Sequence, residues 1–266
     1  RKYSSQTYLN SLTENKMNTN TTSVWRKKLK ELEIVVVIPT YNNGKTLAAV
    51  IEEVYRYADD IIVINDGSTD DTANILEQYP AIRTITHPVN KGKGTALKHG
   101  LSQAKKEGFR YAITIDSDGQ HFASDIPCFI EAIEKEPDTL LVGARNLASD
   151  NMPGKNTFAN KFSNFWFRLE TGLKLEDTQS GYRLYPLRKM DVQSCWYTAK
   201  YEFELEAIVF AAWGDVVVKN IPIHVYYPRS RNGIVHFPSF PGLLPGISAV
   251  LNTDAGADYL PLDYSP

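Results

Sequence analysis

The sequence predicts a single-domain α/β fold, with a mostly parallel β-sheet flanked by helices on both faces. The run Ile34–Ile38 is apolar throughout, as in a strand that is buried on both faces. From there on, strand and helix patterns alternate, and this repeated order implies parallel strands joined by right-handed crossovers. The length of 266 residues and the hydrophobic content of 42% suit one large domain.

Polar turn-forming runs separate the predicted elements. Pro39–Asn43 ends the first strand, Asn65–Asp70 ends the second, and Asn90–Thr95 leads into a helix. Gly67 permits a tight turn, and the side chains after it can cap the next helix. The segments expected to be helical are Gly44–Tyr57, Thr69–Gln78, Gly94–Lys106, Ser124–Lys135, Asn156–Thr171 and Glu202–Ala211. The further strands are expected at Ile61–Ile64, Ile82–Thr86, Tyr111–Ile115, Leu140–Val142, Val216–Val218 and Ile223–Tyr226.

The domain is expected to span residues 34–253. Residues 1–33 are rich in Ser, Thr, Asn and Lys and predict a flexible segment that ends in a short basic helix. Residues 254–266 carry three Asp and no basic residue, and predict a disordered acidic tail.

The basic helix of the first segment is expected at Val24–Leu32. Trp25, Leu29 and Leu32 fall on one helical face, and Arg and Lys side chains surround them. Such a helix can lie on an anionic membrane surface. The alternative, which we favour, is a helix packed on the domain with a solvated basic face.

The overall charge and hydropathy exclude several classes of protein. The formal net charge is -2, from 29 basic and 31 acidic residues, so no global field favours nucleic acid. No stretch reaches the ~18 apolar residues of a membrane-spanning helix, and the start of the chain lacks the apolar region of a signal peptide. The two cysteines lack ligand spacing and suit a reducing compartment. We expect a cytoplasmic protein, soluble or at most peripheral at a membrane.

Two carboxylates follow the fourth predicted strand. Asp116 and Asp118 lie two residues apart on a turn, where they repel each other unless a positive group lies between them. Oxygen ligands of this kind suit Mg²⁺ or Mn²⁺, with substrate phosphates completing the coordination shell. Because ligands of parallel sheets bind at the carboxyl ends of the strands, this turn is the first candidate site.

Other candidate residues follow neighbouring strands. Asp66 ends the second strand and either caps a turn or accepts hydrogen bonds from a base or ribose. The basic, glycine-rich run Asn90–Thr95 can cradle phosphate through main-chain N–H groups. In the second half, Asp177–Arg183 gathers acid, hydroxyls and base in one turn, and we expect a role in the site for it. Basic residues that could converge on a pyrophosphate include Arg145, Lys161, Arg183 and Arg229.

Taken together and in this order, these motifs resemble family 2 glycosyltransferases. The matching runs are Val37–Asn42, Asn65–Asp70, Asn90–Gly94 and Asp116–Gln120. Two later runs, Val142–Arg145 and Ser180–Arg183, are similar to the branch that contains polyprenyl-phosphate sugar synthases, such as dolichyl-phosphate mannose and glucose synthases. The resemblance covers roughly Ile34 to Thr253 and implies a GT-A-type, Rossmann-like sheet.

The resemblance also implies roles for individual residues. Pro39, Tyr41, Asp66, Lys93 and Asp116 would bind the nucleotide sugar. The metal, Mg²⁺ or Mn²⁺, would be held by Asp116, Asp118 and Gln120. Contacts to the acceptor phosphate or the leaving diphosphate would come from Arg145, Arg183, Arg229 and, more weakly, Lys161. The residues expected to act in catalysis are Asp118, Asp177 and Arg183.

The implied reaction is an inverting transfer from a UDP- or GDP-sugar to a polyprenyl-phosphate-type lipid. A phosphate acceptor needs no strong base, because its oxygen is ionised near neutral pH. A hydroxyl acceptor on a glycan or lipid, with Asp177 as general base, is the alternative. A sugar nucleotidyltransferase is disfavoured because Pro39–Asn42 replaces the Gly-rich, Arg-containing loop of those enzymes. An inactive sugar-nucleotide-binding module is disfavoured by the intact Asp116, Asp118 and Gln120.

Overall fold

The computed structural model describes residues 19–145, 154–190 and 202–226, all within the compact unit that runs to Ser230. The strands are β1 (Ile34–Thr40), β2 (Ile61–Asn65), β3 (Arg83–Thr86), β4 (Tyr111–Thr114), β5 (Leu140–Arg145), β6 (Arg183–Pro186) and β7 (Val218–Ile223). The helices are α2 (Thr19–Glu31), α3 (Leu47–Tyr55), α4 (Thr72–Glu77), α5 (Lys93–Lys106), η1 (Ala123–Asp125), α6 (Ile126–Lys135), α7 (Gly154–Thr171) and α8 (Glu202–Trp213). The predicted domain end at residue 253 and the predicted acidic tail lie outside the described residues.

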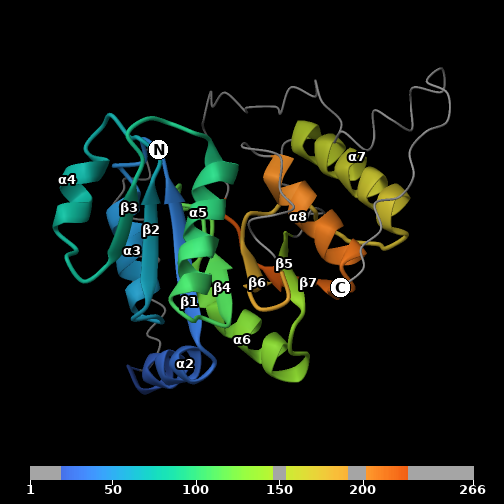
Figure 1. Cartoon of the computed structure of the whole chain (residues 1–266), viewed down its shortest axis with the longest axis horizontal. Helices are drawn as coiled ribbons and strands as arrows, with labels where there is room; N and C mark the ends of the chain where they lie inside the picture. Colours follow the sequence, from blue (N-terminus) through green and yellow to red (C-terminus); the bar gives the residue numbers. More distant parts are fainter. Residues whose placement is uncertain (1–18, 146–153, 191–201, 227–266) are drawn as a thin grey trace, which may run out of the picture. The chain divides into compact units, whose positions relative to one another are not determined.

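The strands form one sheet in the order β3-β2-β1-β4-β6-β5-β7 (Figure 1). β1 pairs in parallel with β2 and β4, β2 with β3, and β5 with β7. Only β6 runs antiparallel among the strands of the described residues, between β4 and β5. The prediction of a mostly parallel sheet flanked by helices is therefore confirmed.

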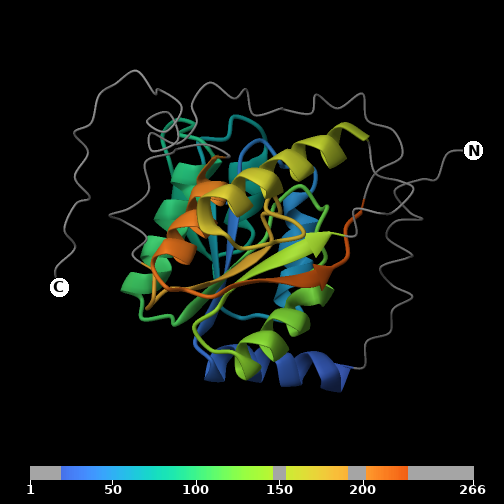
Figure 2. The same ribbon diagram turned by 90° about the vertical axis from the view of Figure 1, so that its right-hand side faces the viewer.

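Two apolar layers, one on each face of the sheet, hold the helices in place. Because side chains alternate along a strand, Val36 and Ile38 of β1 face one layer while Val35 and Val37 face the other. The first layer contains apolar side chains of α2, α3, α4 and α6. The second layer contains those of α5, α7 and α8, and the helices stand on opposite sides of the sheet in Figure 2. Burial on both faces explains the continuous apolar runs of the central strands.

Two strands, β6 and β7, differ from the sequence prediction. β6 was not expected, because this four-residue strand begins with the charged Arg183 and ends with Pro186. The structure has one strand at Val218–Ile223, where the sequence predicted two strands flanking it. Lys219, Asn220 and Pro222 interrupt its apolar pattern, and a proline is tolerated because β7 lies at the edge of the sheet.

Helix α2 packs on the domain, as the favoured alternative predicted. Leu29 is buried, and Trp25 and Leu32 pack against the layer of α3 and α6. Two of its basic side chains pair with acids of neighbouring elements, Arg26 with Asp59 at 2.9 Å and Lys28 with Glu134 at 2.6 Å. None of the helices in the described ranges is long and apolar enough to span a bilayer.

Candidate active site at the carboxyl ends of the strands

The sheet topology brings five segments to the edge of the sheet that is formed by the carboxyl ends of its parallel strands. The parallel strands β1, β2 and β4 end there, and so does β5. Because β6 runs antiparallel, its first residue, Arg183, pairs with Thr114, the last residue of β4. The hydroxyl of Thr114 donates to the carbonyl of Gly181 at 2.7 Å. The turn before β6 therefore lies directly beside the Asp116–Asp118 turn.

The Asp116–Asp118 turn is fixed by side chains of the turn after β1. Asn43 Nδ2 donates to Ser117 Oγ at 2.8 Å, and Thr46 Oγ1 donates to the Ser117 carbonyl at 2.6 Å. Ser117 is buried, whereas the aspartates on either side of it are partly exposed. The main-chain N–H of Gln120 donates to Asp118 Oδ1 at 2.9 Å. Both carboxylates are thus held at the edge of the sheet with access to solvent.

An ammonium group lies against the first of these carboxylates. Lys93 Nζ is 2.7 Å from Asp116 Oδ1 and 2.9 Å from Glu204 Oε1 of α8. Burial alone would raise the pKa of Asp116, but the charges of Lys93 and then of His121 hold it below its usual range. Burial likewise opposes the charge of Lys93, and the two carboxylates outweigh it and raise the pKa of the ammonium. The pair is therefore charged at neutral pH.

Asp66 anchors the loop that precedes Lys93. Its carboxylate accepts hydrogen bonds from the N–H groups of Lys91 at 2.9 Å and Gly92 at 2.8 Å. The buried His87 places Nδ1 2.7 Å from the same carboxylate. These contacts fix the start of α5, so that the side chain of Lys93 can reach Asp116. The structure thus gives Asp66 an anchoring role in this loop.

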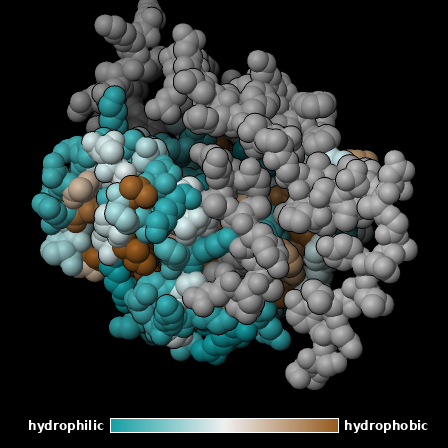
Figure 3. All heavy atoms as spheres, turned by 45° about the horizontal axis from the view of Figure 1, so that its top comes forward, coloured by the Kyte–Doolittle hydropathy of each residue, from teal (hydrophilic) through white to brown (hydrophobic). Residues whose placement is uncertain are grey.

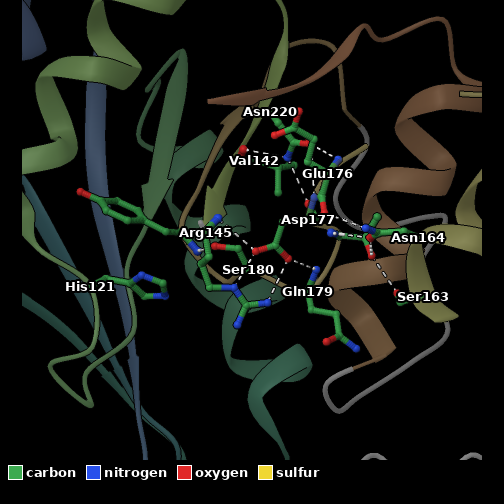
Figure 4. A network of polar contacts seen from close by, with 12 residues as sticks. His121, Val142, Arg145, Ser163, Asn164, Glu176, Asp177, Gln179, Ser180 and Asn220 are labelled. Carbon is green, nitrogen blue, oxygen red and sulfur yellow. Dashed lines mark hydrogen bonds and ion pairs between the residues drawn. The ribbon is translucent and has the colours of Figure 1, made fainter. Parts of the chain in front are cut away.

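Arg145 and Asp177 form a second charge pair, in which the carboxylate is fully buried (Figure 4). Arg145 Nε donates to Asp177 Oδ2 at 2.5 Å and Nη2 donates to Oδ1 at 2.9 Å. The N–H of Gln179 also donates to Asp177 Oδ1, at 3.0 Å. Burial alone would raise the pKa of Asp177, but the hydrogen bonds and charge of Arg145 hold it below its usual range. This two-point contact fixes the plane of the guanidinium.

Arg183 lies inside the protein instead of at the open edge. Its side chain is fully buried and donates to the carbonyls of Ser180 at 2.7 Å and Thr178 at 2.9 Å, and also to that of Glu204. A guanidinium bound to main-chain carbonyls in this way does not face a phosphate. The contacts favour a positioning role for Arg183, and the expected phosphate contact stays a prediction.

The other expected site residues are placed only in part. Pro39 is buried within β1, and Tyr41 in the following turn is 44% exposed. Lys161 belongs to α7, but its side chain lies outside the described set, and Arg229 lies outside the described residues altogether. The structure therefore brings Asp66, Lys93, Asp116, Asp118, Gln120, Arg145 and Asp177 to one edge of the sheet.

Residues 35–191, more than half of the chain, match the family described as Glycosyl transferase family 2. The chain belongs to this family. Its relatives include the UDP-N-acetylglucosamine–dolichyl-phosphate N-acetylglucosaminyltransferase of Methanococcus voltae, which is 30% identical over 79% of this chain and 94% of the relative. The polyprenol monophosphomannose synthase of Mycolicibacterium smegmatis is 26% identical over 71% of this chain and 76% of the relative.

Solved structures agree on the fold of this glycosyltransferase. The glucosyl-3-phosphoglycerate synthase of Mycobacterium tuberculosis in complex with UDP superposes with a TM-score of 0.58. The two chains are 20% identical, and the match covers 77% of this chain and 76% of the other. The glycosyltransferase therefore has the GT-A fold, as the resemblance implied.

The aspartate turn of the glycosyltransferase fits a divalent cation of the Mg²⁺ or Mn²⁺ type. Its donors are the carboxylates of Asp116 and Asp118 and the amide of Gln120, all in one turn. Within the described residues, no group of three or more His, Cys, Asp or Glu side chains is arranged around a common point. Mg²⁺ is usually held by one or two carboxylates together with substrate phosphates, which is the donor set this turn offers.

Two residues of the candidate site were not predicted from the sequence of the glycosyltransferase. Glu204 is buried and reaches Lys93 from α8, and no pattern in the neighbouring sequence predicts this contact. Asn220 of β7 accepts from the N–H of Glu176 at 2.6 Å and donates to the carbonyls of Val142 at 3.1 Å and Asp177 at 3.0 Å (Figure 4). It therefore ties the Asp177 segment to two strands. The only available signal was a polar residue interrupting an apolar strand pattern.

We expect Arg183→Met to destabilise the glycosyltransferase by at least about 3 kcal/mol, because three carbonyls each lose a hydrogen bond from a buried guanidinium. Denaturant unfolding followed by circular dichroism measures this change. The matched control is Arg188→Met, which removes an exposed guanidinium 2.7 Å from Glu33 and should cost less than about 0.5 kcal/mol. A stable Arg183→Met protein that has lost affinity for phosphate ligands would instead support a direct contact between Arg183 and phosphate.

Proposed function

We propose that this glycosyltransferase moves a sugar from a UDP- or GDP-linked donor to a polyprenyl-phosphate-type lipid, with inversion at the anomeric carbon. The observation that carries the proposal is the state of Asp177. This carboxylate is fully buried, and its oxygens accept hydrogen bonds from Arg145 and Gln179. It is neutralised by a guanidinium instead of being poised to remove a proton.

An acceptor hydroxyl would need a general base whose pKa lies near the working pH. The pKa of Asp177 is held low by Arg145 despite its burial. His121, whose Nε2 lies 3.9 Å from Asp116 Oδ2, is buried, and this burial lowers its pKa to about 4. Both groups are weak bases. A phosphate monoester brings its own ionised oxygen to the reaction, so weak bases are no obstacle to it.

Arg145 is the residue that we propose for the acceptor phosphate or the departing diphosphate. Its backbone N–H and its guanidinium both bond to Asp177, which fixes the side chain before substrate arrives. The side chain remains 17% exposed. A preorganised cation in a site of low dielectric stabilises developing negative charge more than a mobile surface cation does.

The donor diphosphate is proposed to lie between the start of α5 and the aspartate turn. Main-chain N–H groups in the first turn of a helix and a lysine ammonium favour phosphate oxygens, and the start of α5 at Lys93 offers both. Two similar proteins support this donor class. The relative from M. voltae is named for its donor UDP-N-acetylglucosamine, and a structural neighbour was solved with Mn²⁺ and UDP. Asp66 and Tyr41 would lie near the nucleoside.

Asp116, Asp118 and Gln120 are the residues proposed to hold Mg²⁺ or Mn²⁺. When bound, the ion would neutralise charge on the leaving diphosphate. The protein's own contribution is to hold the two carboxylates fixed through Ser117 and to place Lys93 and Arg145 nearby. Catalysis then depends on in-line positioning and on these fixed charges.

A lipid acceptor also suits part of the described surface. On the face drawn in Figure 3, hydrophilic side chains dominate the described surface, and apolar ones form small separate groups. Three large apolar side chains of the α7–α8 pair are more than half exposed: Phe165 (60%), Leu169 (62%) and Trp213 (54%). We propose that the protein is peripheral at the cytoplasmic face of a membrane and takes its acceptor there.

A transfer assay tests the proposed function directly. Radiolabelled UDP- and GDP-sugars are offered with polyprenyl phosphate or with the free polyprenol of the same chain length, each with Mn²⁺ or Mg²⁺. We expect product from one donor class and only with the phosphate acceptor. Transfer to the polyprenol or to a glycan hydroxyl, with none to the phosphate, would replace the proposal by the hydroxyl-acceptor alternative.

We expect Asp177→Asn to keep kcat for a phosphate acceptor within about tenfold of wild type and to raise the acceptor KM about tenfold, because Arg145 loses its orienting charge. In steady-state kinetics over pH 5–9, the pH profile of kcat should be the same for the variant and for wild type. The control is Glu176→Gln, the same loss of charge on the exposed neighbouring side chain, which should leave both constants unchanged. Complete loss of transfer in a folded Asp177→Asn protein would favour the general-base role.

A further inference from the structure

The Lys93 ammonium lies between two carboxylates that come from distant parts of the chain. Asp116 belongs to the turn after β4 and Glu204 to the first turn of α8. The ammonium is 2.7 Å from one and 2.9 Å from the other. Glu204 is the more buried partner, with 8% of its side chain exposed against 24% for Asp116. The ammonium therefore has an outer partner in the site and an inner partner behind it.

Gly181 makes this arrangement possible. A Cβ at this position would lie 2.7 Å from Asp116 Oδ2, 2.8 Å from Glu204 Oε1 and 2.8 Å from Lys93 Nζ. The three charged groups therefore meet over a patch of main chain where no side chain fits. Such close convergence of a cation and two anions is a built feature of the fold, since three separate elements and one glycine are needed to produce it.

Asp116 is also a proposed ligand of the divalent cation, so the Lys93 ammonium and the metal ion would compete for the same carboxylate. An ammonium and a metal ion bound to one carboxylate repel each other strongly at such short range. Glu204 offers the ammonium an alternative, because its Oε1 already lies 2.9 Å from Lys93 Nζ and its side chain is more buried than that of Asp116. A small movement of Lys93 towards Glu204 would release Asp116 without leaving the ammonium unpaired in a buried place.

We propose that Lys93 is a built-in counter-ion of Asp116 that competes with the divalent cation, and that Glu204 is the positioning residue that retains Lys93 when the metal binds. This inference rests on the proposed metal role of Asp116. It gives α8 a function in the site: Glu204 touches no substrate and acts through Lys93. In the metal-free protein, the same ammonium prevents repulsion between Asp116 and its acidic neighbours.

The test is the affinity for Mn²⁺ alone, measured by electron paramagnetic resonance of free Mn²⁺ in the absence of nucleotide. Lys93→Met removes the competitor and should tighten Mn²⁺ binding about tenfold. Glu204→Gln removes the carboxylate that retains the Lys93 ammonium when the metal binds, and it should weaken Mn²⁺ binding about fivefold. In the Lys93→Met background, Glu204→Gln should change the affinity less than twofold, because its effect passes through Lys93. The control Glu206→Gln, also buried on α8, should match wild type.

Equal effects of Glu204→Gln in both backgrounds would mean that each charge acts on the metal by itself, and would overturn the inference. If Glu204→Gln does not fold, Lys93→Arg against Lys93→Met decides instead: only the loss of charge should tighten binding, and equal tightening by both would overturn it. Absence of Mn²⁺ binding by wild type even with UDP would remove the proposed metal role as well. If wild type binds Mn²⁺ and the effects of Lys93→Met and Glu204→Gln on the affinity are additive, this inference alone would be wrong.

Discussion

Asp118→Asn is expected to reduce sugar transfer about 10³-fold. The proposed role of Asp118 is to bind the divalent cation on the donor diphosphate, and an amide oxygen is a much weaker ligand for a hard cation than a carboxylate. Asn keeps the size of the side chain and can still accept the hydrogen bond from the N–H of Gln120. The turn should therefore survive, and the loss should fall on catalysis alone.

Initial rates at saturating donor, with and without EDTA, measure this effect. EDTA should reduce wild type to the level of the variant, and Mn²⁺ should restore wild type only. Asp138→Asn is the matched control, because Asp138 is at least partly exposed before β5, away from the site edge, and its left-handed backbone (φ 62°) suits Asn. Undiminished wild-type transfer in EDTA would remove the metal from the mechanism.

The parts of the site that follow parallel strands could be predicted from the sequence. Asp66 and Asp116 each follow a mostly apolar strand, and parallel strands place such residues at the same end of the sheet. The order of the motifs then indicated the family, which the comparison confirms. Local pattern was enough here because each strand, its turn and the following helix form a contiguous unit.

The contacts that complete the site depend on tertiary structure instead. Nothing near Glu204 in the sequence indicates that it reaches Lys93, since α8 is apolar on most sides and the pairing follows from how α8 packs beside α5. The antiparallel β6 could not be predicted from its four residues, yet it brings Gly181 to Asp116. Arg183 shows the converse: its motif suggested a phosphate contact, whereas its burial gives it carbonyl partners.

Gly181→Ala should reduce transfer about 100-fold while the protein remains folded. The φ angle of Gly181 is not in the left-handed region, so an alanine is compatible with the backbone. The methyl group would instead meet the ends of Asp116, Lys93 and Glu204, each less than 3 Å away. These side chains can move aside by rotation, so the stability loss should be about 1 kcal/mol. A displacement of about 1 Å of groups that position a reacting diphosphate is enough for a 100-fold loss.

Separate measurements of thermal stability and kcat/KM distinguish these two effects of Gly181→Ala. Gly214→Ala is the control: it adds the same methyl group after α8, 3.2 Å from the Phe210 carbonyl and outside the charged cluster, and should keep full activity. Because the added methyl displaces Lys93 from Asp116, Gly181→Ala should also alter the affinity for Mn²⁺. A variant with normal kcat/KM would show that the spacing of Lys93, Asp116 and Glu204 is not required for transfer.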